Sequence, residues 1–442
     1  MSESHLPAQQ GAKTARKKKI WNYVIVAIVA TICFLSGCLT MWLSLDTEIR
    51  TLIKLKNRID ESYIYDISDA DFYGAAFDGI NQNLLDPYSV YMTEEEYAET
   101  VAKSKGKKDG LGLAFDTETA NGEKQLLVVR VMGNSPAERA GLQEGDFVVG
   151  YGLTEETLVN DRSYDDFSAF LNGLADGQSV CLRVMRASEE RLFMLTPAPY
   201  VENYVFYRTK ETSYSFTGAN AQTFTVEGQP LSVLDDNTAY IRLTQFNGGA
   251  RAQFDRAMVQ FKADGKTDLV LDLRGNGGGY LDIMQQIAGY FCKNTTEAYP
   301  IVVTSKTKSG NVEKYRANGN RFYDYFTENS RICVLADSST ASASECLIGC
   351  MLDYGTIGYG DICLSTRSGV AKTYGKGIMQ TTYQLSLWGQ DAVKLTTAKI
   401  YWPISGHCIH DRGILPTDGA KTVAENYVKD EEITAAINVL FG

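Results

Sequence analysis

The chain has 442 residues, of which 44% are apolar and 22% are charged. This is ordinary globular composition, which excludes collagen-like, low-complexity and wholly disordered chains. The net charge is 43 − 54 = −11, so we expect no nucleic-acid partner, because phosphate binding needs a basic surface. Since the chain has only three histidines, a His-rich metal site is not expected.

The first 45 residues predict a membrane anchor. Residues 1–19 carry five basic residues and one acidic residue, a balance of 5 − 1 = +4, which we interpret as a cytoplasmic tail. Residues 20–45 carry no charge over 26 positions, and about 20 apolar residues suffice for a helix to cross the hydrocarbon core. Because basic residues stay on the cytoplasmic side, we expect a single-pass protein of the cell membrane whose bulk is extracytoplasmic.

Two alternatives to a permanent anchor remain open. Leu35-Ser36-Gly37-Cys38 is similar to a lipoprotein signal with Cys38 as the lipidated residue, although apolar residues continue to Leu45. A cleaved signal peptide is the other alternative, but the apolar stretch is long and no small-x-small cleavage site clearly follows it. All three interpretations export the rest of the chain.

Seven cysteines lie outside the anchor, and an odd number cannot all pair within one exported chain. Cys346 and Cys350 are four residues apart in a segment that looks helical, so they share a face. Buried thiols are the simplest interpretation, and a disulfide is the alternative. A zinc site is not expected, because no Cys-x-x-Cys pair occurs.

Residues 46–104 are expected to be helical, with a turn at 85–88. Thr93 and Glu96 have the spacing of a capping box that starts a further short helix. The Lys- and Gly-rich residues 104–110 predict a linker.

Residues 105–200, called the β-rich module below, predict strands at 126–132, 145–152 and 180–184, the last as the closing strand. Ser135 and Gly141 suit the start and end of a short helix, and Ser163 suits the start of a second. The module resembles a PDZ domain. Its carboxylate-binding loop is matched by Gly110, Leu111, Gly112 and Leu113. In such domains backbone N–H groups hold a terminal carboxylate while the peptide adds a strand.

Residues 201–442 alternate strand and helix, which indicates an α/β core. We expect strands at 238–243, 269–273 and 333–336, and helices at 254–261, 283–291 and 345–352, followed by a C-terminal helix. The glycine run after residue 273 fails the dinucleotide pattern, because Tyr280 stands where the third glycine belongs. Its N–H groups can still stabilise an oxyanion, unless the run is a plain tight turn.

Two further segments contain residues suited to nucleophilic catalysis. The serine-rich residues 338–345 lie between a strand and a helix, where a serine is ordinarily only a cap. Lys376 lies between two glycines. Burial beside a serine would have to lower its pKa from about 10.4 by roughly 3 units to make it a general base. A histidine-based triad is disfavoured, since only His407 and His410 lie outside the N-terminal tail.

Five separated segments resemble, in order, the C-terminal processing proteases, also called tail-specific proteases. They are DPYSVYMTEEEY, LVLDLRGNGGG, TASASE, YGKGIMQ and LTTAKIYWPISGHCIHDRGILPTD, with the β-rich module between the first two. The resemblance implies Ser342 as nucleophile, Lys376 as general base and Gln380 as the residue that orients the lysine. It also implies an oxyanion hole from the backbone N–H groups of Ala343 and Gly278. The implied mechanism requires no metal and no cofactor. The implied fold is a mixed α/β core related to the crotonase and Clp-protease folds.

The chain departs from the family pattern in three places. Ser342 and Lys376 are 34 positions apart, longer than usual, and the extra loop adds Lys372 as a rival base. Lys372 lacks flanking glycines and a glutamine four residues later, so Lys376 is preferred. Thr340 stands where the family usually has serine, and we expect no added wall-binding domain.

We therefore expect a membrane-anchored, outward-facing serine endopeptidase that cleaves proteins near apolar C-terminal tails. The PDZ domain would recognise the tail and gate activity, and homo-oligomers are possible. The alternative is a catalytically inactive PDZ scaffold, which would follow if the longer connection kept Lys376 away from Ser342.

Overall fold

The computed structural model describes residues 8–120, 123–160, 163–217, 222–225, 230–366, 369–385, 391–426 and 429–441. The chain divides into two compact units, residues 1–85 and 86–442. Each unit is described by itself.

The first unit is helical. Helix α1 (Ala8–Ser44) contains the apolar stretch Trp21–Ser44, which has a mean hydropathy of 2.5 and is long enough to cross a membrane. Helices α2 (Thr47–Ser62) and α3 (Asp69–Asn83) follow, and Ser68 caps α3 by accepting a hydrogen bond from the Asp71 N–H at 3.1 Å. The expected helical structure after residue 46 is confirmed for this unit.

The second unit begins with a strand that local pattern did not indicate. Strand β1 (Val90–Met92) precedes helix α4 (Glu94–Ser104). The predicted capping box is present, since the Thr93 N–H donates to Glu96 Oε2 at 2.8 Å. The predicted linker is wrong in part, because β2 (Lys107–Lys108) pairs with β8 (Tyr200–Val201). Backbone pairing with a distant strand overrides the Lys- and Gly-rich composition.

The β-rich module contains a five-stranded antiparallel sheet in the order β3-β4-β5-β6-β7. The strands are β3 (Leu113–Ala120), β4 (Glu123–Val131), β5 (Phe147–Gly152), β6 (Val180–Arg186) and β7 (Glu189–Leu195). Helices α5 (Pro136–Ala140) and α6 (Tyr164–Asn172), and the 3₁₀ turn η1 (Glu155–Thr157), complete it. The predicted strands and helices are confirmed, but β6 does not close the sheet. It forms a hairpin with β7, whose exposed polar face hid the strand from a hydrophobicity pattern.

The core of the second unit is an eight-stranded sheet in the order β11-β10-β9-β12-β13-β16-β17-β20. The strands from β12 to β20 pair in parallel, whereas β9, β10 and β11 pair antiparallel. The bounds are β9 (Val205–Arg208), β10 (Ser213–Thr217), β11 (Gln222–Thr225), β12 (Thr238–Leu243), β13 (Asp268–Asp272), β16 (Ile332–Ala336), β17 (Ile362–Thr366) and β20 (Lys421–Ala424). The α/β expectation is confirmed.

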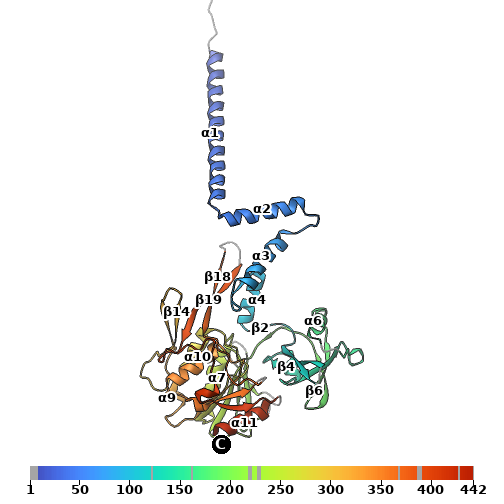
Figure 1. Cartoon of the computed structure of the whole chain (residues 1–442), viewed down its shortest axis with the longest axis vertical. Coiled ribbons are helices and arrows are strands. Elements are labelled where there is room, and N and C mark those ends of the chain that lie inside the picture. Colours follow the sequence, from blue (N-terminus) through green and yellow to red (C-terminus); the bar gives the residue numbers. More distant parts are fainter. Residues whose placement is uncertain are drawn as a thin grey trace, which may run out of the picture. The chain divides into compact units, whose positions relative to one another are not determined.

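Helices cover both faces of this sheet. Helices α7 (Ala250–Ala263), α8 (Leu281–Ala288) and α10 (Ala343–Asp353) pack in one apolar cluster with Ile241 and Leu271. Helix α11 (Lys429–Phe441) packs in a second cluster with Tyr240 and Val270. Because neighbouring residues of a strand point to opposite faces, the sheet is the middle layer between these helices. Figure 1 labels α7, α10 and α11, and the C-terminal helix α11 is coloured red.

A second sheet lies in the same unit, in the order β1-β19-β14-β15 with β18 also paired to β19. Its remaining strands are β14 (Ile301–Thr307), β15 (Val312–Arg316), β18 (Ile378–Gln384) and β19 (Ala392–Tyr401). The short helix α9 (Phe322–Tyr325) and the 3₁₀ turns η2 (Tyr359–Asp361) and η3 (Pro416–Asp418) connect the larger elements. This sheet joins residues near 90 to residues near 390.

Candidate active site

Two loops meet at the carboxyl ends of the neighbouring parallel strands β13 and β16, where α/β sheets commonly form their sites. The glycine loop (residues 273–280) follows β13, and the serine loop (residues 337–345) follows β16. They are joined by backbone and side-chain hydrogen bonds: Ala341 N–H donates to the Asn276 carbonyl at 3.0 Å, and Thr340 Oγ1 donates to the Leu273 carbonyl at 2.9 Å. Gly275 N–H donates to Asp337 Oδ1 at 3.0 Å. The two loops therefore form one rigid unit.

Ser342 has a strained backbone at the start of α10. Its φ is 57° and its ψ is −115°, a conformation that L-residues rarely adopt. The Cys346 N–H donates to its carbonyl at 2.9 Å, which ties this residue to the first helical turn. Strain of this kind is retained where surrounding contacts determine it, commonly at active sites.

Gly278 lies directly against Ser342. A Cβ on Gly278 would be 2.8 Å from the Ser342 Cβ and 2.9 Å from the Ala343 nitrogen, and its φ is +100°. Only glycine fits there. Ala343 is the first residue of α10, so its N–H precedes the first helical hydrogen bond. The Gly278 N–H donates to Asn276 Oδ1 at 2.9 Å within its own loop. The geometry brings the two expected oxyanion-hole residues together, and their role remains a prediction.

Glu345 is a site residue that the sequence reasoning did not assign. Its buried carboxylate accepts from four donors. They are the Ser342 N–H (3.0 Å), the Gly375 N–H (2.8 Å), the Lys376 N–H (2.8 Å) and Thr373 Oγ1 (2.6 Å). Burial raises the pKa of Glu345, and these four hydrogen bonds oppose the rise. The signal in the sequence was an acidic residue three positions after a helix-starting serine, which has the spacing of an ordinary capping box.

Lys376 is half-buried, on the loop that Glu345 holds. Burial lowers the pKa of Lys376, the nearby charge of Lys394 lowers it further, and Asp86 opposes the fall. Its Nζ lies 4.5 Å from the centroid of the Tyr88 ring. Within the described residues, no hydrogen bond joins Lys376 Nζ to Ser342 Oγ. The lysine loop (residues 371–377) and the serine loop are neighbours through Glu345, but the two candidate catalytic side chains are not hydrogen-bonded to each other in the described structure.

Gln380 lies on β18 opposite Thr396 of β19, next to an irregularity in the pairing. Its Nε2 donates to Thr396 Oγ1 at 3.1 Å, and Thr396 Oγ1 in turn donates to Asp86 Oδ1 at 3.2 Å. Across the described part of the chain, Gln380 makes no hydrogen bond to Lys376. Its expected orienting role stays a prediction. Lys372, the alternative candidate for the general base, is half-buried and directly precedes Thr373 in the sequence.

In the β-rich module, the loop Gly110–Leu113 leads into β3, which is the terminal strand of its sheet. A Cβ on Gly112 would lie 2.1 Å from the Ser135 Cβ, and the φ of Gly112 is +80°. Leu111 is buried in the module core, and Phe115 of β3 packs edge-to-face on Phe167 of α6 at 5.3 Å. A terminal strand that faces a helix suits the addition of a peptide strand.

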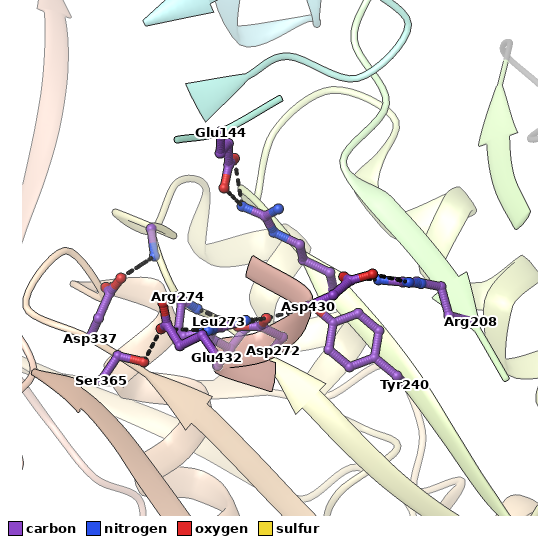
Figure 2. A network of polar contacts seen from close by, with 12 residues as sticks. Glu144, Arg208, Tyr240, Asp272, Leu273, Arg274, Asp337, Ser365, Asp430 and Glu432 are labelled. Atoms are coloured by element: carbon purple, nitrogen blue, oxygen red, sulfur yellow. Dashed lines mark hydrogen bonds and ion pairs between the residues drawn. The ribbon is translucent and has the colours of Figure 1, made fainter. Parts of the chain in front are cut away.

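Figure 2 shows a polar network at the start of the glycine loop, which contains the buried Arg274. Arg274 Nη2 bonds Asp272 Oδ2 at 2.6 Å, and Arg274 Nη1 bonds Glu432 Oε1 of α11 at 2.6 Å. Burial alone would raise the pKa of Asp272, but the Arg274 guanidinium lowers it to about 2. Ser365 donates a hydrogen bond to Glu432. Arg242, opposite Asp272 in the strand register, bonds Glu144 of the β-rich module at 2.8 Å.

All nine cysteines are free thiols, and six of the seven outside α1 are buried. Cys292 Sγ and Cys350 Sγ lie 3.9 Å apart. Burial raises the pKa of Cys346 and of Cys350. The predicted buried thiols are confirmed, except that Cys408 is partly exposed.

Comparison with known proteins supplies the class. Residues 237–418, which include both loops and the lysine, match the family model described as peptidase family S41. A Staphylococcus haemolyticus protein described as a "Probable CtpA-like serine protease" is 26% identical over 448 residues, covering 94% of this chain and 79% of the relative. A Synechocystis "Carboxyl-terminal-processing protease" is 28% identical over 372 residues, covering 81% and 72%. The solved photosystem II D1 C-terminal processing protease has a TM-score of 0.48 and 23% identity, covering 86% of this chain and 93% of that one.

The protein is a serine-type peptidase, and its residues 237–418 match peptidase family S41. Over most of its length the chain is similar to the C-terminal processing proteases.

Proposed function

We propose that the chain is a membrane-anchored, outward-facing endopeptidase that cleaves proteins near their C-terminal tails by a Ser342–Lys376 acyl-enzyme mechanism. Lys376 takes the Ser342 proton, and Ser342 Oγ attacks the scissile carbonyl. The amine leaves with a proton from Lys376, and water then releases the acyl group with Lys376 again accepting a proton. The N–H groups of Ala343 and Gly278 would stabilise the tetrahedral oxyanion, and Gln380 would orient the lysine.

One observation carries this proposal. The Glu345 carboxylate bonds the Ser342 N–H at 3.0 Å and the Lys376 N–H at 2.8 Å. A single side chain therefore couples nucleophile and base, and burial of the lysine favours its neutral form.

The test uses the full chain in detergent with an unfolded protein that bears an apolar C-terminal tail. Cleavage is monitored by mass spectrometry. We expect the parent protein and the Lys372→Ala variant to cleave the substrate. We expect no cleavage by Ser342→Ala or Lys376→Ala. Cleavage by Lys376→Ala would remove that residue from the base role. If the parent protein bound the tail without cleaving it, the inactive scaffold would be favoured. This alternative is considered because no hydrogen bond joins Ser342 to Lys376 in the described structure.

The β-rich module is proposed to be a PDZ domain that gates the protease. The contact between Glu144 and Arg242 supports a route from the module to the core, because Arg242 lies opposite Asp272, the partner of Arg274 beside the glycine loop. Glu144→Gln should keep tail-peptide binding and reduce the stimulation of cleavage by that peptide several-fold. Unchanged stimulation would exclude this route.

Membrane anchoring through Trp21–Ser44 and an extracytoplasmic core are proposed from the apolar helix and the basic tail. Added external protease should digest the core in intact cells and spare the tail. Exposed apolar side chains on the first unit, among them Ile64 at 84% and Leu84 at 76% exposure, support self-association. The mass of the full chain in detergent tests that expectation.

A further inference from the structure

The turn at residues 86–89 contacts the lysine of the proposed site through Tyr88 and is linked to its glutamine through Thr396. It precedes β1, which pairs with β19 through Val90 and Lys394. Thr396 of the same β19 accepts from Gln380 and donates to Asp86. A segment that lies before the β-rich module in sequence is therefore built into the active-site region of the core.

Tyr88 is the residue of this turn that contacts the lysine. Lys376 Nζ lies 4.5 Å from its ring centroid, within the distance of about 6 Å at which a cation interacts with an aromatic face. The Tyr88 hydroxyl donates to the Tyr374 hydroxyl at 3.0 Å, two residues before the lysine. The ring is thus bonded to the lysine loop at one end and covers the amine with its face.

The turn that carries Tyr88 is fixed. Asp86 accepts hydrogen bonds from the Tyr88 N–H at 2.9 Å and from Ser89 Oγ at 2.7 Å. Ser89 is buried, and its Oγ also accepts from the Thr396 N–H at 2.9 Å. Because the turn is tied to β19, the ring cannot follow the lysine when the lysine moves toward Ser342.

We propose that Tyr88 is a positioning residue that holds Lys376 as an ammonium ion in the resting enzyme and so restrains it from acting on Ser342. An aromatic face attracts the charged amine and not the neutral one. The ring therefore opposes the loss of the proton, as does Asp86. Burial and the charge of Lys394 promote that loss. The negative charge of Asp411 also acts on Tyr88 and raises the pKa of its hydroxyl. Cleavage requires the lysine to leave the ring and approach Ser342 Oγ.

This inference rests on the proposed role of Lys376, so its test needs a readout that does not depend on cleavage. In full-length Ser342→Ala protein in detergent, the reaction of Lys376 with acetic anhydride is followed against pH by mass spectrometry. Only the neutral amine reacts, so the pH at which the reaction rate is half its maximum, called the midpoint below, gives the pKa of Lys376. Tyr88→Leu should move the midpoint to lower pH by about half a unit to one unit, and Tyr88→Phe should keep it.

A shape-matched pair separates the ring's charge distribution from its packing. Trifluorophenylalanine at position 88 keeps the ring but weakens its negative face, so it should move the midpoint down relative to phenylalanine. Tyr383→Leu, on the exposed end of β18, is the matched control and should change nothing. A midpoint that is equal for leucine, phenylalanine and its fluorinated form, or that rises with leucine or fluorination, overturns the proposal.

Cleavage by otherwise unmodified enzyme is the second readout. Without a tail peptide, Tyr88→Leu should cleave several-fold faster than the parent at neutral pH. A slower Tyr88→Leu would show that the ring assists the base and would overturn the restraint. If the midpoint shifts but Lys376→Ala still cleaves, the contact is as proposed and the Ser342–Lys376 mechanism fails. The two failures are therefore distinguishable.

Discussion

At the scale of single residues, Glu345 determines how the serine and the lysine are held. Its carboxylate has no hydrogen to donate and accepts from three backbone N–H groups and one hydroxyl. The corresponding amide would direct an NH₂ group at two of these donors. The loops that carry Ser342 and Lys376 would then lose their common partner.

We therefore expect Glu345→Gln to lower kcat/KM by about a hundredfold, the scale of a misplacement of roughly 1 Å among catalytic groups. The folded state should lose about 1–3 kcal/mol, the cost of a buried unsatisfied group. Peptide cleavage and urea unfolding are the measurements, and Glu94→Gln, at an exposed position of α4, is the control. Normal cleavage by Glu345→Gln would show that the loops are held by other contacts.

Lys394 should tune the lysine through charge alone. Its positive charge lowers the pKa of Lys376, so Lys394→Gln should raise that pKa. As the proposed general base, Lys376 must be neutral to act, so the acidic limb of the pH–rate profile should move to higher pH, by about half a unit at the scale of partly screened charges. Lys399→Gln, at an exposed position of the same strand, is the control. A limb that stays in place would remove Lys394 from this role.

At the scale of elements, the sequence allowed prediction of those whose pattern is local. The α/β alternation, the cap at Ser135 and the start of α10 near Ser342 follow from neighbouring residues. Strand β1 did not, because three residues carry little pattern and the partner of Val90 is Lys394. The contact of Tyr88 and Asp86 with the lysine region is equally non-local. The sequence therefore placed these two residues only within a segment that resembles the family, with no link to Lys376.

At Gly349 of helix α10, close packing against Trp402 should outweigh the usual helix propensity of alanine over glycine. Alanine ordinarily favours a helix over glycine by about 1 kcal/mol. A Cβ on Gly349, however, would lie 2.1 Å from Trp402 Nε1. We expect Gly349→Ala to destabilise the core by about 1–3 kcal/mol, the cost of overpacking, as measured by urea unfolding. Gly74→Ala in α3, where nothing lies within 4 Å, should not lower stability. A more stable Gly349→Ala would mean that Trp402 moves freely.

At the scale of the whole molecule, ion pairs join three distant parts of the chain. Arg274 bonds Asp272 and Glu432, and Arg242 bonds Glu144 of the β-rich module (Figure 2). A carboxylate with a depressed pKa stabilises the fold above its unfolded pKa. The contribution of Asp272 should therefore be complete above about pH 4 and be lost as pH falls toward about 2.

Glu432→Gln should cost about 3–5 kcal/mol, because it leaves Arg274 buried with less compensating charge. Urea unfolding measures the loss, and Glu431→Gln, the adjacent exposed carboxylate on α11, is the control. An equal stability of the two variants would mean that Asp272 alone neutralises Arg274.

The contact of Glu432 with Arg274 also bears on when the enzyme becomes active. Synthesis proceeds from the N-terminus, so Ser342 and Lys376 emerge well before α11. Until Glu432 arrives, Arg274 lacks one of its two carboxylate partners beside the glycine loop. A nascent chain that already carries Ser342 and Lys376 therefore still has an incomplete core. If Ser342 and Lys376 act as proposed, we expect proteolytic activity only after the last helix, α11, has docked.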